Sequence, residues 1–269
     1  MNISYNKTNK KRKRNNESDS CMDIIVPVVV IIIVLTIWQL ACSFRLVPSY
    51  MLPSPIRVVK AFINDFDLLM KHAKTTMTEA FLGMGLGVLL GFVSAALMDA
   101  FKVVRRGLYP ILILTQTIPP VAIAPLLILW FSYGIAPKVV LVVLVSYFPI
   151  AIGLLEGFES VDKDLIRMMK SMNAGTRQIF WHVKFPCALG EFFSGLKIAA
   201  SYSIVGAVIA EWLGGFNGLG VYMTRVKKSM SYDKMFAVIF FVSALSLILM
   251  ALIKLLQKKA MPYKYIKDK

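Results

Sequence analysis

The chain has 269 residues, of which 57% are hydrophobic and 17% are charged, and its formal net charge is +16. A soluble domain is about 45–50% apolar, so this composition excludes an ordinary soluble protein and indicates an integral membrane protein. Three cysteines in apolar surroundings and two separate histidines predict neither a disulfide framework nor a metal cluster.

Six apolar runs are long enough to cross a membrane as helices. A spanning helix needs about 20 predominantly apolar residues, and its backbone polar groups must be satisfied within the segment. The sequence therefore predicts an all-α integral membrane fold, a six-span helical bundle. The predicted spans are Ile24–Cys42, Glu79–Met98, Leu108–Phe131, Val139–Leu155, Phe192–Leu213 and Met235–Leu256.

The N-terminal segment, residues 1–23, is polar and strongly basic. In front of a spanning helix, such a segment favours orientation of the chain and contact with anionic lipid rather than nucleic-acid binding. With this end inside, 20 Lys and Arg residues lie inside and 10 outside, and Lys197 lies within a span. The excess predicts a multi-pass plasma membrane protein with both termini cytoplasmic. Basic cytoplasmic tails, 1–23 and 257–269, would flank a transmembrane domain at 24–256.

The first connection contains three prolines, Pro48, Pro53 and Pro55, which remove backbone donors and bias the preceding residues to extended geometry. The segment that follows, Val58–Met70, carries apolar residues at helical spacing. It predicts one amphipathic helix on the outer membrane surface or against the bundle.

Small residues recur at every fourth position of the second span. Positions about one turn apart share a helix face, so these residues form a smooth stripe that lets another helix approach closely. We interpret the stripe as a helix contact and not as a ligand site. Its members are Gly83, Gly87, Gly91 and Ala95.

The third span is interrupted by prolines, among them Pro119 and Pro120, next to the polar pair Gln116 and Thr117. Non-helical backbone at membrane depth is tolerated where it is buried in protein or lines an aqueous cavity. Two interpretations stay open: a plain kink, or a pathway lined by Gln116 and Thr117.

The fifth span carries two ionisable side chains, Lys197 and Glu211. Such groups are costly within a membrane and are functional candidates by default. For each side chain two interpretations stay open. It has a structural role, in which it pairs with another group or snorkels to the interface, or it contacts the solute directly. The glycine-rich run after Glu211, residues 214–220, lacks the Lys and Ser/Thr of a phosphate-binding loop and predicts a flexible outer turn.

The connection between the fourth and fifth spans, residues 157–185, is long, polar and basic. Asp162 can cap a first helix that reaches Asn173 and carries an apolar stripe. Gly175 stands where that helix would turn, in a conformation that a Cβ disfavours, and Thr176 would cap a second short helix. We expect a rigid cytoplasmic projection that contacts another protein. The predicted contact residues are Met169, Met172, Ala174, Gly175, Ile179, Phe180 and Pro186, the last of which would end the second helix.

No catalytic motif is present. The chain has neither a H-E-x-x-H nor a G-x-S-x-G sequence, and His72 and His182 do not share metal-ligand spacing. We therefore expect no catalytic residue, metal ligand or cofactor in this chain.

Within the long connection, Ala174, Gly175 and Pro186 resemble the EAA loop of binding-protein-dependent ABC transporter permeases. The Glu-Ala-Ala triplet of that family is replaced by Met, Lys and Ser at positions 169–171, but the place between the fourth and fifth spans matches. Further stretches, across roughly residues 24 to 256, resemble the nitrate, sulfonate and taurine branch, which includes permeases for the pyrimidine precursor of thiamine. They are Leu52–Pro55, Ile118–Phe131, Gly206–Trp212 and Gly218–Gly220.

The resemblance implies the transmembrane domain of a type I ABC importer. Two permease copies, as a homodimer, would form the solute pathway. Two ATP-binding subunits would contact the 157–185 loop and hydrolyse ATP, and an extracytoplasmic solute-binding protein would deliver the solute. That solute would be a thiamine pyrimidine precursor, a sulfonate, taurine or nitrate, and the few charges in the spans favour a weakly charged or aromatic compound.

Two alternatives remain from the residues alone. In an autonomous ion-coupled secondary transporter, Lys197 and Glu211 would be the ion-linked groups. A membrane-embedded enzyme would need site chemistry that the sequence lacks.

Overall fold

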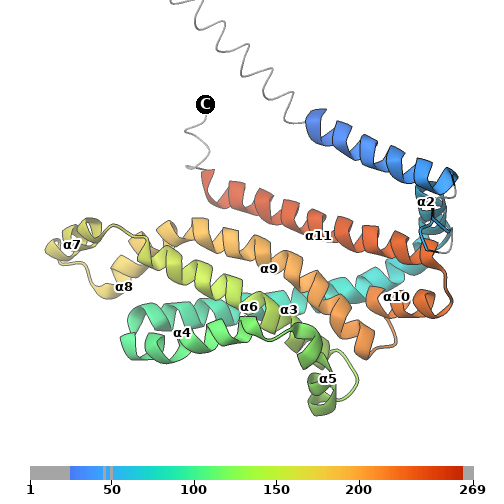
Figure 1. Ribbon diagram of the computed structural model, residues 1–269. Coiled ribbons are helices and arrows are strands. Elements are labelled where there is room, and N and C mark those ends of the chain that lie inside the picture. The colour runs from blue at the N-terminus through green and yellow to red at the C-terminus, as the bar shows by residue number, and fades with distance from the viewer. Residues whose placement is uncertain (1–24, 45–46, 49–50, 263–269) are drawn as a thin grey trace, which may run out of the picture.

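The computed structural model describes residues 25–44, 47–48 and 51–262 (Figure 1). All regular elements in these ranges are helices, which confirms the predicted all-α class. The first is Ile25–Ser43. The others are α2 (Pro55–Asn64), α3 (Phe66–Ala100), α4 (Lys102–Thr117), α5 (Pro120–Phe131), α6 (Ala136–Glu159), α7 (Lys163–Ser171), α8 (Thr176–Ile179), the π-helix η1 (Phe180–Lys184), α9 (Phe185–Leu213), α10 (Leu219–Lys228) and α11 (Tyr232–Ala260).

Within the described part of the chain, five helices are long and apolar enough to span a membrane, and the bent pair α4–α5 makes a sixth if it counts as one span. The helices extend beyond the predicted apolar runs, because a helix continues until a cap or a break ends it. Helix α11 therefore runs to Ala260, into the predicted tail 257–269, whereas the predicted tail 1–23 lies outside the described residues.

The segment predicted as one amphipathic helix, Val58–Met70, is divided between two helices at Asp65. Ser54 caps the first of them, since its hydroxyl accepts a hydrogen bond from the backbone N–H of Arg57, and Pro55 occupies the first turn. The second amphipathic part continues without interruption into the span α3.

Helices α3, α6 and α9 form the centre of the bundle. A Cβ on Gly91 of α3 would lie 2.8 Å from Cγ2 of Ile150 in α6, and Cβ atoms on Gly83 and Gly87 would also collide with α6 side chains. The predicted stripe is therefore a helix contact, as expected, and the contact lies within one chain.

The contact between α6 and α9 is equally close. A Cβ on Gly157 would lie 2.7 Å from both Cα and Cβ of Ala188, and a Cβ on Gly153 would lie 2.8 Å from the carbonyl oxygen of Glu191. Small residues thus allow the three central helices to pack backbone against backbone.

The two ends of the bundle differ. In Figure 1, α7 and α8 lie at one end of α6 and α9, and α10 lies at the other. The helix Ile25–Ser43 runs toward the α10 end, and α11 runs back toward the end that carries α7 and α8. Both ends of the described chain therefore face the same way as the α7–α8 projection.

The break in the third predicted span is larger than a plain kink. Helices α4 and α5 meet at an angle of 103° across Ile118 and Pro119. Prolines 119 and 120 have no N–H to continue the hydrogen bonds of α4, and Pro120 starts α5 in the first-turn position that suits proline.

The 157–185 connection contains the two short helices that the sequence predicts, but their boundaries differ. The side chain of Asp162 caps α7 by accepting from the N–H of Asp164 at 2.8 Å, as expected. The helix ends at Ser171, and Asn173 takes a left-handed conformation with φ 62°. Asparagine tolerates this region better than most residues.

The prediction that Gly175 needs a glycine conformation is wrong. Gly175 has φ −71° and ψ 161°, which any residue adopts, and a Cβ there would meet only Oε1 of Gln178 at 4.0 Å. Gly175, rather than Thr176, is the N-cap of α8. The left-handed turn that the sequence assigned to Gly175 is at Asn173.

The prediction that Pro186 ends the second helix is also wrong. Residues Thr176–Leu213 form one continuous helical segment of 38 residues, in which α8 passes through η1 into α9. Pro186 lies in the first turn of α9, directly after the wider π turn. A π turn changes the hydrogen-bond register, and this allows a proline to follow without a break.

Candidate functional site

A cavity of about 290 Å³ lies between the α4–α5 break, α6 and α9. Residues on both sides of the break line this space together with residues of α6 and α9. Most of its lining is aliphatic. The lining residues are Thr115, Gln116, Ile118, Pro120, Ile123, Leu141, Leu144, Val145, Tyr202, Val205, Gly206 and Ile209.

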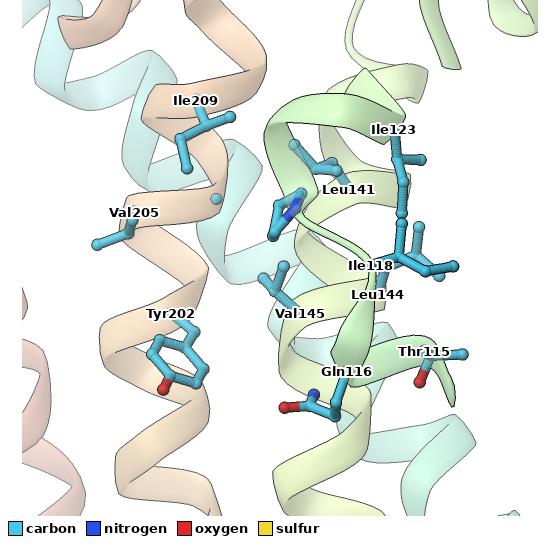
Figure 2. A pocket seen from close by; sticks show the side chains of 12 residues that line it. Thr115, Gln116, Ile118, Ile123, Leu141, Leu144, Val145, Tyr202, Val205 and Ile209 are labelled. Atoms are coloured by element: carbon cyan, nitrogen blue, oxygen red, sulfur yellow. The ribbon is translucent and has the colours of Figure 1, made fainter. Parts of the chain in front are cut away.

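Three side chains with polar atoms line the cavity, and none of them is charged: Thr115, Gln116 and Tyr202. Figure 2 shows Gln116 from α4 and Tyr202 from α9 on opposite sides of the opening. The hydroxyl of Thr115 donates to the carbonyl of Leu112 at 2.7 Å. The amide of Gln116 and the phenol of Tyr202, whose residue is 48% exposed, are the other two polar groups of the lining.

Of the four residues predicted to line a pathway, one lines the cavity. Gln116 lines the cavity, whereas the lining does not include Thr117, whose hydroxyl donates to the carbonyl of Leu114 at 2.8 Å. Lys197 donates to Oε1 of Gln257 in α11 at 3.2 Å. Glu211 belongs to a separate polar cluster near α10.

Tyr202 was missed at the level of the sequence, although a signal was present. Tyr202, Val205, Gly206 and Ile209 follow the spacing of one helix face. Leu141, Leu144 and Val145 of α6 do the same. Such faces are common in any membrane helix, so the spacing alone does not indicate a cavity. The cavity forms where these two faces meet the α4–α5 break.

The cluster near α10 contains a buried ion pair. Lys138 in the first turn of α6 donates to Glu79 of α3 at 2.6 Å, and the side chains are only 6% and 2% exposed. The sequence placed Lys138 in an outer loop and Glu79 at the edge of a span. Lys138 also lies 3.5 Å from the carbonyl of Asn217, so the pair adjoins the glycine-rich turn.

The glycine-rich turn is fixed, and the prediction of a flexible turn is wrong. Three consecutive backbone N–H groups donate to buried side chains: Gly218 to Nδ1 of His72 at 3.0 Å, Leu219 to Thr76 at 2.9 Å, and Gly220 to Glu211 at 2.6 Å. Thr76 in turn donates to Glu211 at 2.7 Å. Glu211 therefore holds the turn in place and is 1% exposed.

Asp65, between α2 and α3, ties this end of the bundle to α10 and α11. It pairs with Lys234 at 2.7 Å and accepts a hydrogen bond from the hydroxyl of Tyr222. Burial raises the pKa of Asp65, but the hydrogen bonds and charge of Lys234, together with Tyr222, outweigh burial and leave that pKa below its ordinary value. Burial and the neighbouring Asp65 raise the pKa of Tyr222, so its phenol stays a donor.

The projection formed by α7 and α8 is exposed at the opposite end. None of the residues of α7 is buried, and Met172 directly after it is 71% exposed. Met169 and Ala174 are half-buried and Gly175 is exposed.

Two predicted contact residues of the projection point inward instead. Ile179 is 5% exposed, and the ring of Phe180 lies 5.2 Å from that of Phe158 in α6. Both side chains pack within this chain, and their contact with a partner stays a prediction. They attach the projection to the core of the bundle.

Among the described residues, no group of three His, Cys, Asp or Glu side chains could hold a metal ion. The polar side chains of the cavity and of the cluster near α10 are suited to hydrogen bonding and packing.

Residues 87–261 match the family model described as binding-protein-dependent transport system inner membrane component. A probable ABC transporter permease protein of Haemophilus influenzae is 38% identical over 216 residues, which cover 80% of this chain and 88% of that protein. The formylaminopyrimidine transport permease protein ThiX of Halalkalibacterium halodurans is 34% identical over 232 residues, covering 86% and 92%. A chain of the MetNI methionine ABC transporter has the same fold, with a TM-score of 0.63 at 17% identity over 73% of this chain and 98% of that one.

Proposed function

The chain belongs to the family of binding-protein-dependent ABC importer permeases, and we propose that its cavity carries a small, uncharged, ring-shaped organic solute. The observation behind this proposal is the lining, in which an amide, a phenol and a threonine hydroxyl are the polar groups and no charged side chain takes part. An anion such as nitrate or a sulfonate needs a cationic or multiply hydrogen-bonding partner when it leaves water. Gln116 can bond in the plane of a heterocycle, and the ring of Tyr202 can stack on it.

Similarity to the ThiX protein favours a pyrimidine of the formylaminopyrimidine type among these compounds. Uptake into proteoliposomes that contain the chain, its ATP-binding subunit and its solute-binding protein tests the proposal. Labelled formylaminopyrimidine should accumulate, and excess taurine, alkanesulfonate or nitrate should not compete. Accumulation of one of these anions instead would refute the solute class.

The pathway residue with the sharpest test is Tyr202. Replacing Tyr202 with Leu removes both the ring and the hydroxyl, and we expect about a tenfold rise in KM, the size of one lost stacking contact of about 1.4 kcal/mol. Tyr133→Leu is the matched control, because Tyr133 is 70% exposed and does not line the cavity. If the two changes raised KM equally, Tyr202 would not line the pathway.

The α7–α8 projection is the proposed contact for the ATP-binding subunits, two of which would serve a dimer of this chain. Among the predicted contact residues, Met172 has a side chain that is free to meet a partner, since the residue is 71% exposed. Met172→Glu should lower retention of the ATP-binding subunit about tenfold during purification, since a charge is costly in an apolar contact. Met230→Glu, at a methionine that is 69% exposed near α10, should leave retention unchanged.

We infer that the α7–α8 side of the bundle is cytoplasmic, with both basic tails, and that the α10 side receives the solute-binding protein. The division of Lys and Arg residues supports this orientation. In a cysteine-free chain, an impermeant thiol reagent added outside should label Arg225→Cys and not Lys170→Cys. The reverse pattern would invert the topology.

The ion-coupled transporter gains no support from the contacts of its two candidate residues. Lys197 bonds Gln257, whereas Glu211 bonds Thr76 and Gly220 in a different part of the bundle. Each has a structural partner, and neither lines the cavity.

A further inference from the structure

A second hollow lies on the periphery of the bundle, between the helix Ile25–Ser43, α2 and α11. Its volume is about 330 Å³, within the range of about 300–1,000 Å³ that is usual for small-ligand sites. The walls are apolar and aromatic, and include Trp38, Val59, Phe62 and Phe240. We refer to this hollow as the apolar groove.

A polar hollow of about 460 Å³ lies at the end of the helix Ile25–Ser43. Its lining includes Gln39 and Arg57. Gln39 follows Trp38 in the first helix, and Arg57 precedes Val58 in α2, so neighbouring residues of the same two helices line the two hollows. We refer to the two hollows together as the amphipathic site.

Two buried polar atoms at this site lack a hydrogen-bond partner among the residues that the structure describes. They are the indole Nε1 of Trp38, a donor, and the amide Oε1 of Gln39, an acceptor. The amide nitrogen of Gln39 donates to the hydroxyl of Ser43 at 3.3 Å. Buried polar groups without partners are rare in native proteins and call for an explanation.

The site also offers a positive charge. Arg57 is exposed, and it takes part in none of the ion pairs between described residues. Trp38 lies five residues before the end of its helix, about 8 Å along the axis, which suits the interfacial depth where tryptophan is enriched. The amphipathic site therefore offers apolar walls, two hydrogen-bonding groups and a cation.

We propose that this site binds one molecule of an anionic phospholipid with a hydroxylated headgroup, of the phosphatidylglycerol type. An acyl chain occupies the apolar groove, an ester carbonyl accepts from the indole of Trp38, the phosphate pairs with Arg57, and a headgroup hydroxyl donates to Gln39. Charge complementarity at Arg57 and the placement of the two hollows along the same two helices favour this occupant over a purely apolar one.

Native mass spectrometry of the full chain, purified in a non-ionic detergent and supplied with phosphatidylglycerol, tests the proposal. Val59→Trp fills the apolar groove and should lower the retained lipid at least about tenfold, while Ile63→Trp, one turn further along α2 and 65% exposed, should retain it. Arg57→Gln should weaken retention about tenfold through loss of a charge-assisted contact, and Lys60→Gln on the same helix should not. The unmodified chain should retain less phosphatidylcholine, which has no headgroup hydroxyl.

Three results would each overturn the proposal. Equal retention by Val59→Trp and Ile63→Trp would exclude the apolar groove. Equal retention of phosphatidylglycerol and phosphatidylcholine by the unmodified chain would exclude headgroup recognition. Loss of a chain dimer rather than of lipid on Val59→Trp would assign the groove to a second copy of the chain. Because Arg57→Gln is a surface change, it tests the site even if Val59→Trp fails to fold.

Discussion

The contact between α6 and α9 gives the sharpest prediction about the fold. Gly157→Ala would place a methyl carbon 2.7 Å from both Cα and Cβ of Ala188 and 3.1 Å from its carbonyl oxygen. Ordinary van der Waals contact begins at 3.4 Å, so the two carbon contacts must each lengthen by 3.4 − 2.7 = 0.7 Å. Most of the colliding atoms are backbone, and Ala188 has no rotamer that relieves the clash.

Overpacking of this kind costs about 1–3 kcal/mol. For a chain of this size, 1 kcal/mol shifts Tm by roughly 2–4 °C, so we expect Gly157→Ala to unfold at a Tm lower by roughly 2–12 °C. Thermal unfolding of the purified protein in detergent, followed by intrinsic fluorescence, measures the shift.

The matched control is Gly85→Ala on α3, where an added Cβ has no atom within 4 Å. Alanine is favoured over glycine in a helix by about 0.5–1 kcal/mol, so Gly85→Ala should hold or raise Tm. If Gly157→Ala unfolds at the same temperature as Gly85→Ala, then α6 and α9 are not packed backbone against backbone, and the reasoning fails.

Lys138→Met should destabilise the protein by about 3–5 kcal/mol, because it leaves the carboxylate of Glu79 buried without its cation; adding Glu79→Gln should recover most of the loss in thermal unfolding, and no recovery would contradict the pairing. Because the pKa of Asp65 is lower in the folded chain than the unfolded value of about 3.9, its contribution to stability is complete above that value and is lost as pH falls through the folded pKa. Asp65→Asn should therefore lower Tm at neutral pH and flatten its decline in acid, and an unchanged acid profile would refute this role. Gly218→Ala should destabilise by about 1–3 kcal/mol, since Gly218 has φ 128° beside the carboxylate of Glu211, whereas Gly134→Ala should be neutral.

The spans and the helix contact at Gly87 could be predicted from the sequence because both depend on local composition. Long apolar runs fix which segments lie in lipid, and small residues at every fourth position fix which face meets a neighbour. The projection was predicted for the same reason, since Asp162 and the apolar spacing after it act within one turn.

The errors arise where a local rule competes with tertiary contacts. Proline usually ends a helix, but the π turn before Pro186 lets α8 continue into α9. Glycine often marks a left-handed turn, yet Asn173 takes that conformation and Gly175 does not. The partners Glu79 and Lys138 are 59 residues apart in the sequence, and nothing in their immediate neighbours pairs them.

The unbroken segment Thr176–Leu213 has a mechanical consequence. Its 38 residues form a rod about 57 Å long, with the α7–α8 projection at one end and Glu211, which holds the outer turn, near the other. A rod without a hinge transmits a tilt, and a rotation of about 5° about one end would displace the other end by about 5 Å over that length. We therefore expect spin labels at Arg177 and Trp212, which is 45% exposed, to keep one separation in every state of the transporter, while each moves relative to α3.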